Sequence, residues 1–90
     1  MHDWTLLDVH VDWPNSSLSM TFRNNMSEEA MLTAQGLVNI HVPKSEPWGR
    51  SVSVNEIRGP LKFDSELQKL TIEMQSGDCI EIVARSICLP

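Results

Sequence analysis

The stretch LTIEMQSGDCIEIVA, residues 70–84, decides the fold class, because apolar and polar residues alternate on both sides of a short polar turn. The alternating apolar residues are Leu70, Ile72, Met74, Ile80, Ile82 and Ala84. Such alternation is typical of strands with one buried face. We therefore expect a β-hairpin with a three-residue loop, Ser76–Asp78, in which Gly77 supplies a positive φ and Met74 pairs with Ile80.

Residues 7–23 carry the same two-residue period around the polar segment PNSS. The apolar residues before and after this segment are Leu7, Val9, Val11, Trp13, Leu18, Met20 and Phe22. The first set has odd numbers and the second even numbers, so paired residues must sum to an odd number if both sets face one core. A loop over residues 14–17 then pairs Trp13 with Leu18 on the core face and Asp8 with Arg23 on the outer face.

The middle of the chain also alternates, with two interruptions. Residues 30–42 hold apolar side chains at even positions around Gly36, which predicts one long bent strand or two short ones. The pattern resumes at Val54 and slips in phase before Ile57, which predicts a bulge near Asn55 and Glu56. A very short strand is expected around residues 61–63.

These segments predict an all-β domain covering residues 1–90, with six to seven antiparallel strands in a small sandwich or open barrel. The alternative is an α+β fold with one short helix near residues 26–32, where MSEEAML can form a helical turn. A chain of 90 residues has a thin core. Pairing with a second copy would cover apolar surface and an exposed strand edge, so we expect a homodimer.

Charge and composition narrow the classes of partner. The net charge is −5, and no Lys or Arg precedes Arg23, whereas nucleic-acid binding requires a basic surface. No apolar run is long enough to span a bilayer, and the first residues do not resemble a secretory signal. Cys79 and Cys88 are too far apart along an extended strand for a disulfide. We expect a cytoplasmic protein with free thiols that binds neither nucleic acid nor membrane, and whose acidic surface suits a basic protein partner.

Chemistry-bearing residues are sparse. Asp8, His10 and Asp12 alternate on one predicted strand, and with His41 they are weak candidates for a metal site. The same alternation is what a solvated outer strand face requires, and this interpretation is preferred. No motif identifies a catalytic residue or a cofactor. The prediction is therefore a non-enzymatic protein without metal or cofactor; the alternative is an enzyme or small-ligand protein with its site between subunits.

Trp48 lies between Pro47 and Gly49 in a loop between two predicted strands. The neighbouring prolines restrict the backbone, so the indole is held in one place. It covers the end of the core or anchors a subunit or partner interface, where Trp is enriched. Trp48, Pro47, Arg50 and Trp4 are the candidate interface residues.

Three tracts carry a resemblance: PWGRSVSVNE at residues 47–56, IEMQSGDCIEI at residues 72–82, and HDWTL with VHVDW near the N-terminus. They resemble a group of small uncharacterised bacterial proteins, some of which look like products of mobile (integron-type) gene cassettes or of toxin–immunity loci. The resemblance implies a bacterial cytoplasmic protein that works by binding, in an immunity-type or regulatory role. It brings no established activity.

Overall fold

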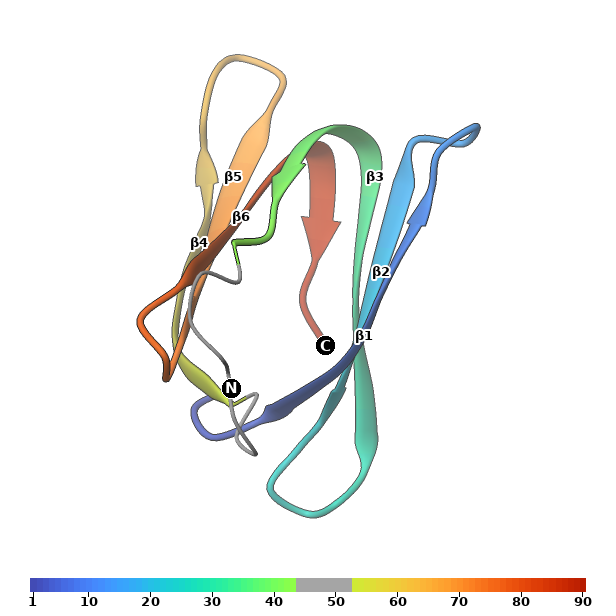
Figure 1. Ribbon diagram of the computed structural model, residues 1–90. Helices are drawn as coiled ribbons and strands as arrows, with labels where there is room; N and C mark the ends of the chain where they lie inside the picture. The colour runs from blue at the N-terminus through green and yellow to red at the C-terminus, as the bar shows by residue number, and fades with distance from the viewer. Residues whose placement is uncertain (44–52) are drawn as a thin grey trace.

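Six antiparallel β-strands form one sheet in the computed structural model, which describes residues 1–43 and 53–90 (Figure 1). The strands are β1 (Thr5–Asp12), β2 (Ser17–Arg23), β3 (Glu29–His41), β4 (Val54–Lys62), β5 (Gln68–Met74) and β6 (Cys79–Cys88). The prediction of an all-β fold is confirmed. The described part of the chain contains no helix, so the alternative helix near residues 26–32 is wrong.

A tight turn takes the place of that helix. The side-chain Oδ1 of Asn24 accepts hydrogen bonds from the backbone N–H groups of Met26 and Glu28, at 2.9 and 3.0 Å. Asn side chains compete in this way with helical backbone bonds, and they favour turns for that reason. Residues 24–28 therefore reverse the chain between β2 and β3.

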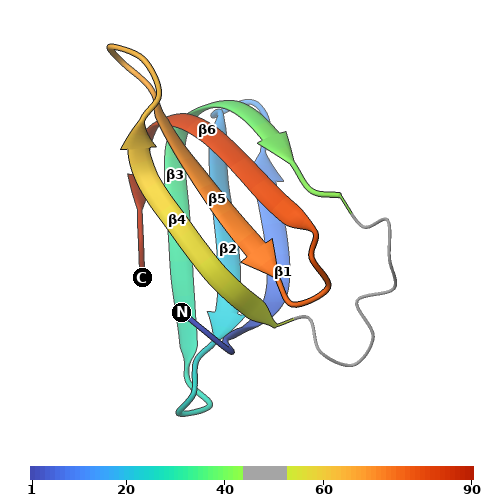
Figure 2. The same ribbon diagram turned by 90° about the vertical axis from the view of Figure 1, so that its left-hand side faces the viewer.

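The strand order is β1-β2-β3-β6-β5-β4, so β3 lies beside the last strand of the β4-β5-β6 meander in a Greek-key arrangement. Strands β3 and β6 are long and bend, so that the sheet folds over on itself (Figures 1 and 2). At one end the two outer strands meet. Thr5 lies opposite Ser53, and Val54 exchanges backbone hydrogen bonds of 2.8 Å with Asp3 and Trp4. The result is a barrel closed at one end of the β1–β4 seam.

The bend in β3 occurs at Gly36, where φ is +63°. Two residues later the pairing with β6 shifts, because Val38 is an extra residue between the pairs Leu37–Ala84 and Asn39–Val83. The expected irregularity near Gly36 is confirmed, and the strand is one long bent strand. Val38 is the extra residue itself and is 61% exposed, although the even-position pattern predicts a core residue there. Leu37 before it and Ile40 after it both pack against the core.

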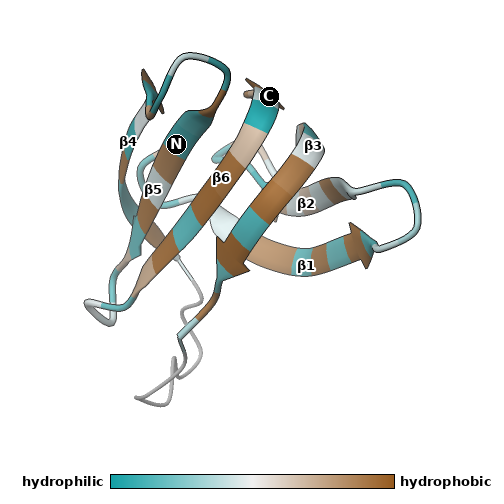
Figure 3. Cartoon of the chain, turned by 90° about the horizontal axis from the view of Figure 1, so that it is seen from above, coloured by the Kyte–Doolittle hydropathy of each residue, from teal (hydrophilic) through white to brown (hydrophobic). Residues whose placement is uncertain are grey.

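The core lies between the two halves of the folded sheet. Its buried side chains are Leu6, Leu18, Met20, Phe22, Leu32, Ala34, Val54, Leu70, Ile72, Met74, Ile80, Ile82 and Ala84. The alternation of apolar and polar residues along the strands is visible in Figure 3. Trp4 packs against this core, with its ring 6.5 Å from that of Phe22. The apolar sets of both predicted hairpins supply most of these residues.

The register of the first hairpin differs from the prediction by two residues. Val11 pairs with Leu18 and Val9 with Met20, whereas the prediction pairs Trp13 with Leu18. The loop covers residues 13–16 instead of 14–17. The core face is preserved because a shift of two residues leaves the side-chain parity unchanged. Leu7 is a bulge residue that departs from the parity and is exposed, while Leu6 is buried.

The last hairpin shows the same kind of shift. Ile72 pairs with Ile80 and Leu70 with Ile82, so the predicted pairing of Met74 with Ile80 is wrong by two residues. Met74 N–H instead donates to the Asp78 carbonyl at 2.8 Å, which leaves three loop residues, 75–77. The expected loop length and the positive φ of Gly77, +95°, are confirmed.

Strand β4 unites two segments that the sequence separates. The pairing with β5 shifts between Val54 and Glu56, which confirms the predicted bulge, and again between Arg58 and Leu61. The short strand expected around residues 61–63 is therefore the end of β4 rather than a separate element. Cys79 and Cys88 stand at opposite ends of β6 as free cysteines, as predicted.

Candidate functional site

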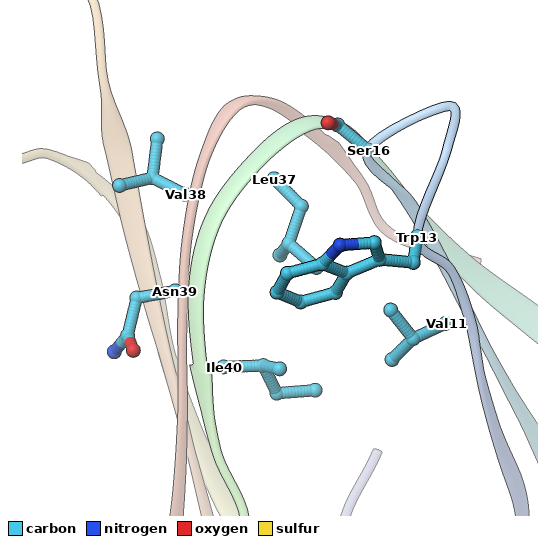
Figure 4. A pocket seen from close by; sticks show the side chains of 7 residues that line it. All are labelled: Val11, Trp13, Ser16, Leu37, Val38, Asn39 and Ile40. Atoms are coloured by element: carbon cyan, nitrogen blue, oxygen red, sulfur yellow. The ribbon is translucent and has the colours of Figure 1, made fainter.

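A groove of about 480 Å³ opens between the end of the β1–β2 hairpin and the second half of β3. The residues that line it are Val11, Trp13, Ser16, Leu37, Val38, Asn39 and Ile40. Leu37 and Ile40 point towards Trp13 and Val11, as Figure 4 shows. Four apolar side chains from two distant parts of the chain therefore face one another across the groove.

The groove exists because β3 leaves β2. Pairing between these strands ends at Ser17 and Gln35, and beyond it the Leu37 N–H donates to the Ser16 carbonyl at 2.8 Å. From there β3 continues to His41 in contact with β6. The first hairpin and the second half of β3 diverge at this point. Val11, Leu37 and Ile40 keep one side against the core, and their other side lines the groove.

Trp13 is the most exposed large apolar residue of the described chain, with 82% of its surface accessible. It begins a four-residue turn in which the Ser16 N–H donates to the Trp13 carbonyl at 3.2 Å. Pro14 holds the second position of this turn, which its fixed φ favours. The turn places the indole beyond the last β1–β2 pair, Asp12–Ser17, and beside the groove (Figure 4).

The sequence-based prediction that Trp13 faces the core is thus wrong. The sequence patterns also did not predict the groove. One local signal does identify the position. Because Pro14 favours the second position of a turn, the turn should begin at Trp13. A turn that begins there removes the indole from the strand.

Among residues 1–43 and 53–90, no ionisable side chain lines the groove, and Ser16 and Asn39 are the polar members of this described lining. General acid–base and nucleophilic catalysis both require a group that gains or loses a proton next to the reacting atoms. The described lining offers apolar surface that a bound partner could bury.

The structure does not bring the four weak metal candidates together. Asp8 lies opposite Thr21 and His10 opposite Ser19, while Asp12 accepts a hydrogen bond of 2.9 Å from Asn15. The predicted pairing of Asp8 with Arg23 is wrong, because Arg23 lies opposite Thr5.

His41 is at the far end of β3, opposite Glu81 of β6. Within residues 1–43 and 53–90, no three His, Cys, Asp or Glu side chains converge in a way that could hold a metal ion.

The interface candidates fall into two groups. Trp48, Pro47 and Arg50 lie outside the described residues. Trp4 is half-buried at the closed end of the barrel, where it contacts the core. A role for Trp4 in an interface stays a prediction.

A polar cluster surrounds Arg58 on the outer surface. Its guanidinium lies 2.9 Å from the Glu56 carboxylate and 3.7 Å from that of Glu73, and it points to the Cys79 sulfur at 4.0 Å. Desolvation lowers the pKa of Arg58, but the hydrogen bond and charge of Glu56, together with Glu73, outweigh it and raise the pKa. The cluster is an exposed ion-pair network, which contributes little to stability.

A shallower depression of about 310 Å³ lies on another part of the surface. Lys62 and Arg85 line it together with Asp64 and Glu66, so its charges balance. The Asp64 carboxylate is hydrogen-bonded to the backbone: its Oδ1 accepts hydrogen bonds from the N–H groups of Glu66 and Leu67. This arrangement closes the β4–β5 turn.

Comparisons with known proteins establish the fold alone. No protein-family model and no curated protein match the sequence. The fold is similar to the crystal structure of an uncharacterized protein from Neisseria gonorrhoeae, with a TM-score of 0.73 and 15% sequence identity. The match covers 98% of this chain and 90% of that chain. Among the described residues there is no helix that could span a membrane.

Proposed function

We propose that this protein works by binding another protein, and that the groove beside Trp13 is the contact surface. The observation that carries the proposal is the 82% exposure of Trp13 at the edge of an apolar groove. Trp is enriched among the residues that dominate binding energy, especially beside pockets that become desolvated. An indole left this exposed gains a large apolar contact when a partner covers it.

The composition of the groove favours binding over catalysis. An enzyme or small-ligand protein with its site between subunits is the rival hypothesis, and such a site would need ionisable or strongly polar groups at its centre. The part of the groove formed by described residues offers apolar side chains with two neutral polar ones, Ser16 and Asn39. It is also open along the exposed indole, which suits a protein segment better than an enclosed small molecule.

The biological role that we propose is an immunity-type or regulatory one in the bacterial cytoplasm. The resemblance of the tracts at residues 47–56 and 72–82 supports it, as does the acidic charge, which suits a basic partner. Self-association belongs to the proposal as well. Besides Trp13, large apolar residues such as Met31, Leu61 and Phe63 are more than half exposed, and a second copy would cover part of this surface.

A capture experiment in cell extract tests the groove. The tagged protein and its Trp13→Ala variant are used as baits, with Met26→Ala as the matched control because Met26 is 78% exposed in the β2–β3 turn, outside the groove lining. Proteins retained by the wild type and by Met26→Ala but lost with Trp13→Ala support the proposal. Equal retention by all three baits, with the variants folded, contradicts it.

A further inference from the structure

We draw no further inference here: the strongest candidate, the apolar groove between the β1–β2 hairpin and the second half of β3, carries nothing beyond the proposed function, because nothing in the described residues, 1–43 and 53–90, shows what covers it.

Discussion

The side chain of Arg85 lies directly over Gly36: its Cβ, Cγ and Cδ atoms stand 2.8–2.9 Å from the position that a β-carbon on Gly36 would occupy. Gly36 has a φ of +63° and marks the bend of β3. The missing side chain therefore serves two purposes. It permits a left-handed backbone conformation, and it lets β6 pass closely behind β3 where the groove begins.

Replacement of Gly36 tests this relationship. Gly36→Ala should lower the free energy of unfolding by about 3 kcal/mol, of which roughly 1–2 kcal/mol comes from the positive φ and the rest from the clash with Arg85. The measurement is urea unfolding followed by circular dichroism. Gly77→Ala is the matched control, because Gly77 also has a positive φ but nothing within 4 Å of the new β-carbon. Only the backbone cost should appear there.

A double-mutant cycle isolates the part of the clash that comes from the Cγ and Cδ atoms of Arg85, because Arg85→Ala retains the Cβ atom at 2.9 Å. Arg85→Ala shortens the side chain over Gly36, so Gly36→Ala should cost about 1 kcal/mol less in that background. Identical costs in both backgrounds would show that the Cγ and Cδ atoms of Arg85 add nothing to the cost of Gly36→Ala.

Truncation of Trp4 should lower the stability of the fold, whereas truncation of Trp13 should leave it nearly unchanged. Trp4→Ala should destabilise the fold by about 2 kcal/mol, because the half-buried indole packs on the core beside Phe22. Trp13→Ala should change the stability by less than about 0.5 kcal/mol, since the side chain is 82% exposed. Thermal and urea unfolding of both variants gives the comparison. A large loss of stability in Trp13→Ala would mean that the indole supports the fold rather than a contact.

The turn at Asn24 offers a test of local structure. Asn24→Ala removes the acceptor for the N–H groups of Met26 and Glu28 and should cost about 1 kcal/mol. Asn39→Ala, at an exposed groove position, should cost less than about 0.5 kcal/mol. The contrast in urea midpoints checks the role of the side-chain acceptor. Equal midpoints would indicate that the turn holds without it.

Self-association is open to direct measurement. The chain mass is 10.2 kDa, so a homodimer should give a molar mass near twice that value by light scattering at micromolar concentration. The physical reason is that a chain of this size has a thin core and leaves apolar surface exposed to solvent, which a second copy would bury. A molar mass near that of one chain would refute the dimer.

The sequence by itself determined which faces of the strands are buried. Leu70, Ile72 and Met74 alternate with polar residues and are all buried, as are Ile80 and Ile82 on the partner strand. A two-residue period fixes this parity wherever one face is covered. The bulge at Asn55 and Glu56 was also visible as a break in the period, and Gly77 as a turn residue.

The same period left the registers undetermined. Both hairpins pair two residues away from the prediction, and a shift of two keeps the paired side chains on their predicted faces. The exceptions in the first hairpin are Leu7, at a bulge, and Trp13, which enters the turn. The choice depends on where each turn closes. At Trp13 it depends on Pro14 holding the second turn position, and near Gly77 on the hydrogen bond between Met74 and Asp78.

Only the tertiary structure decided that there is a groove and that Trp13 stands beside it. The groove forms because β3 bends at Gly36 and leaves β2 for β6, and this pairing joins Leu37 to Ala84 across the length of the chain. Local alternation reports which side of a strand is apolar, but it cannot report which distant strand covers that side or where the cover ends. At Val11, Leu37 and Ile40 this cover is incomplete, because two strands of one sheet diverge there. The apolar surface that the described residues, 1–43 and 53–90, leave uncovered is the candidate binding site.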